Sequence, residues 1–220
     1  MRPPQTNLAQ NEAENLFGDF HPLLEQIGSA ECLTLAGAVN ASLPLERVND
    51  FPSFKKFLEN YRSQLLAPLE FPLICQACTH AARNEFSELI SLDQQLVRDS
   101  RIEFFASASQ RIGRIQLKRL RPLRDQRGLQ RYLRAVDDGQ AHGWHTLVYG
   151  VTLASFSFPL RQGLVNYAEQ VLNGFVQSAS RRFEFSEGER EKLLQEICLT
   201  IPTAIENALA GKPAFALRLA

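Results

Sequence analysis

Cysteine and histidine are the residue types in this chain most able to hold a metal. Cys75, Cys78 and His80 lie together in "CQACTH", and on a helix the two cysteines share a face where thiolates could bind Zn²⁺ or Ni²⁺. No second CxxC and no HxxxH motif supplies further ligands. The simpler interpretation is two small buried residues beside a surface histidine, and the alternative is a partial metal site shared with another protein.

A second pair of candidates flanks the only tryptophan, in "HGWH". His142 and His145 are three residues apart, so they could bind a metal or act as acid and base. The nearest acidic side chains upstream are Asp137 and Asp138. The simpler interpretation is that His145 begins a helix and that Trp144 is a packing anchor.

Residues 111–134 form a strongly basic segment, with nine of the 24 basic residues and one acid, Asp125. Clustered arginines suit carboxylate or phosphate recognition, because the planar guanidinium can donate two parallel hydrogen bonds. Three interpretations stay open: a solvated helix face, a docking site for an acidic protein, or a nucleic-acid site, which usually also needs exposed aromatic residues. On a solvated helix, the apolar positions would point inward: Ile112, Ile115, Leu117, Leu120 and Leu123.

Enzyme motifs are missing from the sequence. It has no nucleophile elbow, P-loop, dinucleotide-binding glycine motif or HExxH, so we expect no catalysis. The formal net charge is zero, which gives no general attraction to nucleic acid or anionic membrane and favours self-association, so a homodimer stays open. Without an apolar stretch of about 18 residues, a secretory signal or a disulfide framework, we expect a cytoplasmic protein.

The elements that must position these residues are predicted to be helices. Apolar residues recur at helical spacing from Leu164 to Ala179 and form one continuous stripe, whereas period-two alternation is not found. We predict an all-α fold: a single compact globular domain of about nine or ten helices around a central apolar helix. The predicted boundaries are a loose tail over 1–14, the helical domain over 15–210 and a short tail over 211–220.

Local signals also predict where helices begin and end. Asp50 precedes an apolar periodic run, and Ser186 begins a capping box in "SEGE". Pro68 and Pro72 predict a bend between two helices, and Ser157 is a candidate cap before the helix that follows Pro159. Glycines inside helical patterns predict close contacts between helices, at Gly113, Gly150 and Gly174.

Most of residues 55–195 resembles the UreF family of urease accessory proteins. The family pattern begins with His–x–x–Val–aromatic–Gly, continues through an apolar helix and Pro-Leu, and ends in a helix that finishes at Arg. The matching positions are His145, Val148, Tyr149, Gly150, Pro159, Leu160, Tyr167, Val176, Ala179 and Arg181. Upstream, "APLEFPL" is similar to an Ala-Pro-Leu-x-x-Pro-Leu segment, and a second helix matches through Leu92, Asp93, Glu103, Ala108, Ser109, Gly113 and Arg114.

The resemblance implies a non-catalytic all-α scaffold. Proteins of this family pair with the accessory protein UreD (also called UreH) and recruit the GTPase UreG, and the complex delivers nickel to apo-urease. No stably bound cofactor is implied, because the complex handles the nickel. We expect partner contacts at Arg111, Arg114, Tyr149 and Arg181, and we expect His145 to begin a packed helix.

The chain also departs from the family pattern. "IGSAECLTLAGAVNASLPLE" stands where the family has Leu-Pro–x–Gly-Gly-Phe, and "KPAFALRLA" stands in place of its basic and aromatic tail, which helps to dock UreD. The alternative function is therefore a divergent UreF-like adaptor with a different protein partner and no role in nickel delivery.

Overall fold

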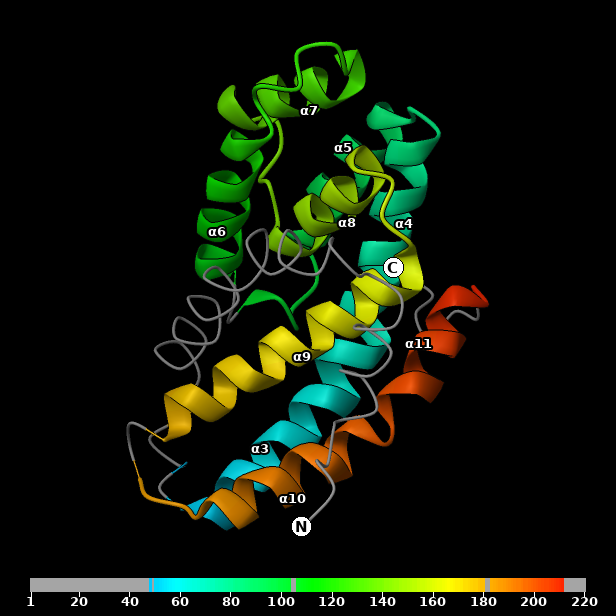
Figure 1. Ribbon diagram of the computed structural model, residues 1–220. Helices are drawn as coiled ribbons and strands as arrows, with labels where there is room; N and C mark the ends of the chain where they lie inside the picture. The colour runs from blue at the N-terminus through cyan, green and yellow to red at the C-terminus, as the bar shows by residue number, and fades with distance from the viewer. Residues whose placement is uncertain (1–47, 49, 104–105, 181–182, 212–220) are drawn as a thin grey trace.

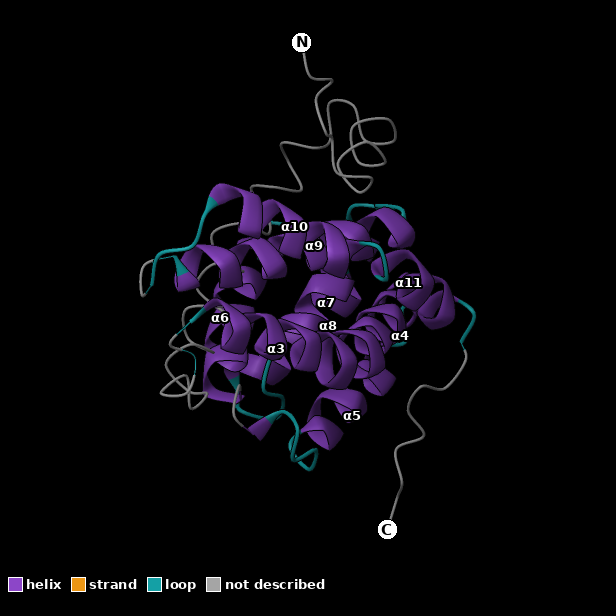
Figure 2. Ribbon diagram, turned by 90° about the horizontal axis from the view of Figure 1, so that it is seen from below, coloured by secondary structure: helices purple, strands orange, loops and turns teal. Residues whose placement is uncertain are grey.

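Helices are the only regular elements in residues 48, 50–103, 106–180 and 183–211, the part of the chain that the computed structural model describes (Figures 1 and 2). The prediction of a single compact all-α domain is confirmed. The helices are α3 (Phe51–Tyr61), the π-helix η3 (Arg62–Glu70), α4 (Phe71–Ala82), α5 (Phe86–Leu96), α6 (Ala106–Arg119), α7 (Arg127–Asp137), α8 (His145–Ser155), α9 (Leu160–Ala179), α10 (Glu187–Cys198) and α11 (Ile201–Leu209). The tail predicted over 1–14 and all but Gly211 of the one over 211–220 lie outside the described residues, so those boundaries stay predictions.

Capping boxes begin two of the helices where the sequence predicts them. At α3 the Asp50 carboxylate accepts a hydrogen bond from the Ser53 amide at 2.9 Å, and the Ser53 hydroxyl accepts one from the Asp50 amide. At α10 the Ser186 hydroxyl and the Glu189 carboxylate make the same reciprocal pair. These side chains satisfy amide donors that have no partner within the helix, which confirms both predicted starts.

The two prolines predicted to bend the chain do not end a helix. Pro68 lies inside η3, which joins α3 to α4 without a break, and Pro72 lies in the first turn of α4. A proline ring clashes with the carbonyl four residues earlier in an α-helix, and the wider π-helical turn relieves this clash. The Phe71 amide accordingly donates to the Leu66 carbonyl, five residues back. At the position of the predicted bend, the chain stays helical and changes helix type.

Ser157 ends α8 and does not cap α9. Its φ of 55° is in the left-handed region, and the next amide, that of Phe158, donates to the Leu153 carbonyl at 2.8 Å. This is a helix C-terminal arrangement. The residue at the N-terminal cap of α9 is Pro159, so the predicted role of Ser157 is wrong.

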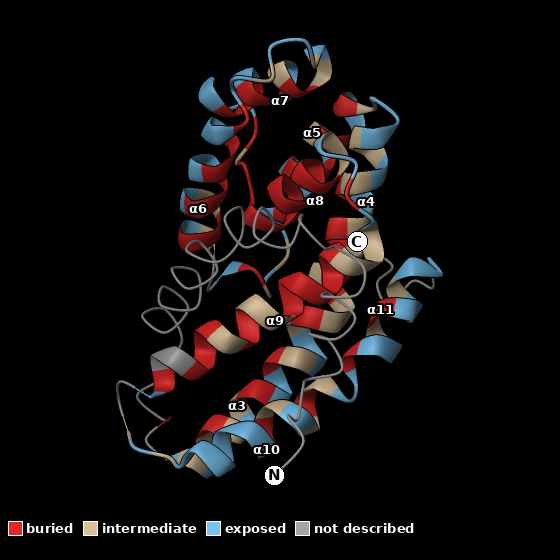
Figure 3. Ribbon diagram, viewed as in Figure 1, coloured by how far each residue is buried: buried red, intermediate tan, exposed pale blue. Residues whose placement is uncertain are grey.

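The buried residues form two apolar clusters. One gathers around α9 with α3, α10 and α11, and the other lies among α5, α7 and one face of α8; α4, α6 and α8 contribute to both. The predicted stripe on α9 is buried, with no member more than 3% exposed: Leu164, Tyr167, Ala168, Val171, Leu172, Phe175, Val176 and Ala179. The first nine residues of α8 are buried on every side (Figure 3), so α8 is the element between the two clusters.

Gly150 lies at a close contact between α8 and α4. A Cβ atom at this position would lie 2.5 Å from the Ile74 carbonyl oxygen and 2.9 Å from the Ala77 Cβ. We expect Gly150→Ala to lower the free energy of unfolding by roughly 1–3 kcal/mol, because α4 backbone must move to admit the methyl group. Urea unfolding followed by circular dichroism measures the change, and an unaltered midpoint would contradict this close contact.

Candidate functional site

Cys75, Cys78 and His80 do not gather as a ligand set in this structure. Burial raises the pKa of the Cys75 thiol to about 11 and also raises the pKa of Cys78, so both side chains are neutral thiols at pH 7. His80 instead places Nδ1 2.9 Å from Oε2 of Glu85. Throughout the described ranges, no three His, Cys, Asp or Glu side chains gather as a ligand set.

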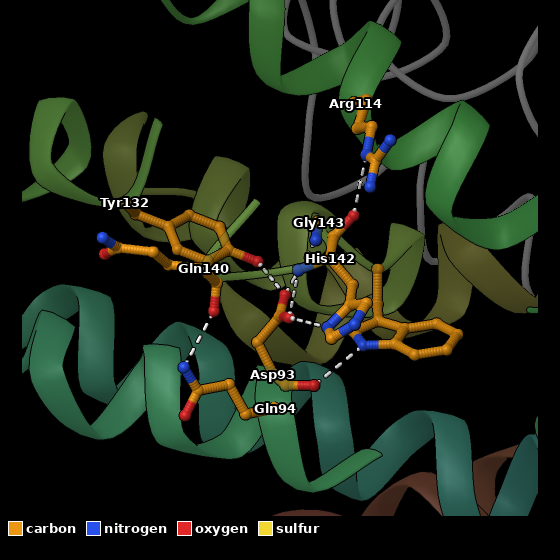
Figure 4. A network of polar contacts seen from close by, with 8 residues as sticks. Asp93, Gln94, Arg114, Tyr132, Gln140, His142 and Gly143 are labelled. Atoms are coloured by element: carbon orange, nitrogen blue, oxygen red, sulfur yellow. Dashed lines mark hydrogen bonds and ion pairs between the residues drawn. The ribbon is translucent and has the colours of Figure 1, made fainter. Parts of the chain in front are cut away.

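His142 pairs with an acid that lies far away in the sequence. Its Nδ1 is 3.2 Å from Oδ1 of Asp93 on α5, whereas Asp137, one of the upstream acids, pairs with Arg121. Asp93 is completely buried and is the centre of the network in Figure 4. The acidic partner of His142 is therefore distant in sequence, because the fold brings α5 against this segment.

The Asp93 carboxylate accepts hydrogen bonds from three sides. Oδ2 accepts from the Tyr132 hydroxyl at 2.7 Å and from the Gly143 amide at 2.9 Å, and Oδ1 accepts from the His142 amide at 2.5 Å. The indole N–H of Trp144 donates to the Asp93 backbone carbonyl at 2.9 Å. Asp93 thus fixes the connection between α7 and α8, which we call the 138–144 segment.

Two glycines allow the 138–144 segment to fold around Asp93. Gly139 and Gly143 have φ values of 73° and 71°, in the left-handed region that glycine adopts without steric cost. The Gln94 side chain adds a second tie from α5, donating to the Gln140 carbonyl at 2.8 Å (Figure 4). The turn-rich loop predicted from "VDDGQAHGWH" is therefore a tightly held connection.

His145 begins α8, as the sequence predicts, and its amide is capped from another helix. The residue before it, Trp144, supplies no side-chain cap, and the His145 amide donates to the Ser109 hydroxyl of α6 at 3.1 Å. The ring places Nδ1 3.1 Å from Oε1 of Gln116, also on α6. The ring is completely buried between the helices, and the structural role expected for His145 stays a prediction.

We expect His145 to make stability depend on pH. Burial lowers the pKa of His145 from 6.5 to about 4, so the unfolded chain takes up a proton more readily and stability falls as the pH drops below about 6.5. From this group alone, the free energy of unfolding should fall by about 2 kcal/mol between pH 7 and pH 5. Urea unfolding at both pH values should show a smaller loss for His145→Gln than for the unsubstituted protein. An identical pH dependence would contradict the buried neutral imidazole.

α6 lies beside the 138–144 segment, and Gly113 makes this packing possible. A Cβ at Gly113 would lie 1.9 Å from the Gly143 carbonyl oxygen and 2.8 Å from the His145 amide nitrogen. The next residue, Arg114, donates from Nε to the His142 carbonyl at 3.1 Å. These contacts hold α6 against one side of the 138–144 segment, and Asp93 holds the other side.

The other side of α6 is exposed and basic. Arg111, Arg114 and Lys118 are all exposed, and Ile115 between them is 41% exposed. With Ser107 and Gln110 they line a hollow of about 540 Å³. The prediction that Ile115 points inward is wrong, because Ile115 is exposed and the buried positions of α6 are Ala108, Ser109, Ile112, Gly113, Gln116 and Leu117.

The remaining predicted partner-contact residues lie elsewhere. Tyr149 is 1% exposed and donates from its hydroxyl to the Gly163 carbonyl at 2.9 Å, so it is a core residue and not a surface contact. Gly174 is on the buried side of α9. Arg181 lies outside the described residues, so its role stays a prediction. Of the predicted partner-contact residues, the structure brings together Arg111 and Arg114, on the exposed side of α6.

Sequence reasoning missed Asp93, Tyr132 and Gln116 as members of one framework. Asp93 and Ser109 do belong to the family-like segments, which is the one signal that could have pointed to them. Their partners are 49 and 36 residues away along the chain, and no local pattern encodes such pairs.

Comparison with known proteins gives one family. A family model with the description UreF matches residues 48–197, which run from just before α3 to near the end of α10. No curated protein matches the chain. In the described ranges, none of the helices is both long enough and apolar enough to span a bilayer.

Proposed function

Because the chain belongs to the UreF family of urease accessory proteins, we propose that it acts as a non-catalytic scaffold in the maturation of urease. In this proposal it binds UreD (UreH) and the GTPase UreG, and the assembly delivers nickel to apo-urease in the cytoplasm. Nickel is the cargo of the complex, and the scaffold holds none of it stably.

The observation that carries the proposal is the extent of the family match. Residues 48–197 contain α3 to α9 and nearly all of α10, which is the framework that buries both apolar clusters. The polar groups inside this framework support the same conclusion, since Asp93 and His145 are used to hold segments together. Such groups give a rigid body on which partner proteins can assemble.

Complementation tests the proposal. Expression of this chain in cells that lack their own UreF should restore urease activity when nickel is supplied. Purified chain should also form a complex with UreD at micromolar concentrations, and that complex should retain UreG. Failure of both assays with a folded protein would contradict the proposal.

The alternative is a UreF-like adaptor with another partner. Its support is the sequence that stands in place of the family's N-terminal segment. Under this alternative, the chain would leave urease inactive in the same cells while remaining folded and monodisperse. Restored urease activity would contradict it.

A further inference from the structure

The outer face of α6 combines features that none of the core contacts explains. Arg111, Arg114, Ile115 and Lys118 follow one another at offsets of three, four and seven residues, so they share one face of the helix. We propose that this face, the α6 outer face, docks an acidic segment of a partner protein that also carries an apolar side chain. The inference rests on the proposed function, because it assigns a surface to the scaffold's partner binding.

Two of the cations on this face have no carboxylate partner among the described residues. Neither Arg111 nor Lys118 makes an ion pair with a described residue, whereas the nearby Arg121 pairs with Asp137 at 2.6 Å. Cations that gather on one surface without a carboxylate partner attract proteins that carry carboxylates and repel basic ones. The charge on the α6 outer face therefore points to an acidic occupant.

Ile115 and the hollow beside it indicate how such a segment would be anchored. Ile115 is among the few large apolar residues of the described part that are strongly exposed, and it lies between the three cations. Protein interfaces typically place an apolar anchor at the centre of a polar rim. The hollow of about 540 Å³ offers room for an apolar side chain from the partner.

A nucleic-acid occupant fits this surface less well. Binding to single strands uses exposed aromatic rings on which bases stack, and Tyr132, the aromatic residue of the basic segment, is completely buried. The chain as a whole has no net positive charge to attract a polyanion. A protein with an acidic, apolar-anchored segment matches the observations better.

The α6 outer face is also connected to the Asp93 network. Arg114 lines the hollow and at the same time donates to the His142 carbonyl (Figure 4). Trp144, the only tryptophan of the chain, is two residues further on and donates to Asp93. Docking on Arg114 should therefore change the fluorescence of Trp144.

The test is a pair of charge-reversal variants. Arg111→Glu with Lys118→Glu changes the α6 outer face, and Arg127→Glu with Arg131→Glu is the matched control, because α7 exposes two arginines of the same basic segment. Affinity for purified UreD, UreG and apo-urease of the same organism is measured by titration calorimetry, and the folding of each variant by thermal unfolding. We expect the first variant to lose at least tenfold in affinity for one of the three proteins, and the control to stay within twofold.

A third variant tests the apolar anchor. Ile115→Ser leaves the charges unchanged and, since Ile115 is 41% exposed in the free protein, should change the thermal midpoint little. We expect it to weaken the same partner at least fivefold. Binding of that partner to the unsubstituted chain should alter Trp144 fluorescence, and the Arg111 and Lys118 variant should abolish this change at the same partner concentration.

The outcomes separate this inference from the proposed function. Suppose that the unsubstituted chain binds its partners and activates urease. If the α6 and α7 charge-reversal variants then have the same affinity for those partners, whether unchanged or equally reduced, the α6 docking inference is wrong. The proposed function stands in that case. If Arg111→Glu with Lys118→Glu alters only self-association or DNA binding, the occupant is a second copy or a nucleic acid, which also overturns it. If the unsubstituted chain binds none of the three and fails to activate urease, the proposed function fails and the inference fails with it.

Discussion

Replacement of Gly113 by alanine is expected to destabilise the protein by about 3 kcal/mol or more. The new methyl carbon would stand 1.9 Å from the Gly143 carbonyl oxygen and within 3 Å of backbone atoms of Trp144 and His145. None of these atoms is the end of a flexible side chain that can rotate away. The 138–144 segment cannot retreat easily either, because Asp93 holds it from the other side.

Gly188 is the matched control for this substitution. It lies in the first turn of α10, and a Cβ there would meet nothing within 4 Å. Gly188→Ala should therefore stabilise the helix slightly, by about 0.5–1 kcal/mol, through the lower flexibility of the unfolded chain. Urea unfolding of both variants measures the contrast, and equal midpoints would refute the tight packing of α6 on the 138–144 segment.

Loss of the Asp93 carboxylate should have an equally large effect. Asp93→Ala removes the acceptor of the Tyr132 hydroxyl and of the His142 and Gly143 amides, and it leaves these donors in or near the core. Buried donors without a partner are costly, and removal of one member of a buried charged network typically costs roughly 3–5 kcal/mol. We expect a loss of that size in the free energy of unfolding.

Tyr132→Phe measures how much the hydrogen bond from the Tyr132 hydroxyl alone contributes to stability. It removes one donor and leaves Asp93 bound by both backbone amides, so we expect a loss of only about 1–2 kcal/mol. The double variant with Asp93→Ala should lose less free energy of unfolding than the sum of the two single losses, because both substitutions remove the same hydrogen bond. Strict additivity would show that Tyr132 and Asp93 act independently, contrary to the geometry.

Local signals in the sequence predicted the fold well. The stripe on α9 and the capping boxes at Asp50 and Ser186 depend on residues within a few positions of each other, and each has the predicted structure. The π-helix at Pro68 was not predicted, because a proline does not reveal whether a helix breaks or widens. That outcome depends on the tertiary packing on both sides of η3.

The candidate site was harder to predict, because its contacts join distant segments. No pattern relates Asp93 to His142, and the inward direction expected for Ile115 failed since other residues occupy the buried positions of α6. The basic character of the segment was visible at once. Its arrangement around an exposed apolar residue became visible only when the orientation of α6 was known.

The cap that Ser109 provides for α8 has a consequence for hydrogen exchange. The His145 amide is completely buried and donates to a hydroxyl on a different helix, so solvent can reach it only when α6 separates from α8. Both helices contribute to both apolar clusters, and their separation would open the whole domain. The His145 amide proton should therefore be replaced by deuterium at the rate of global unfolding, among the slowest sites in the molecule.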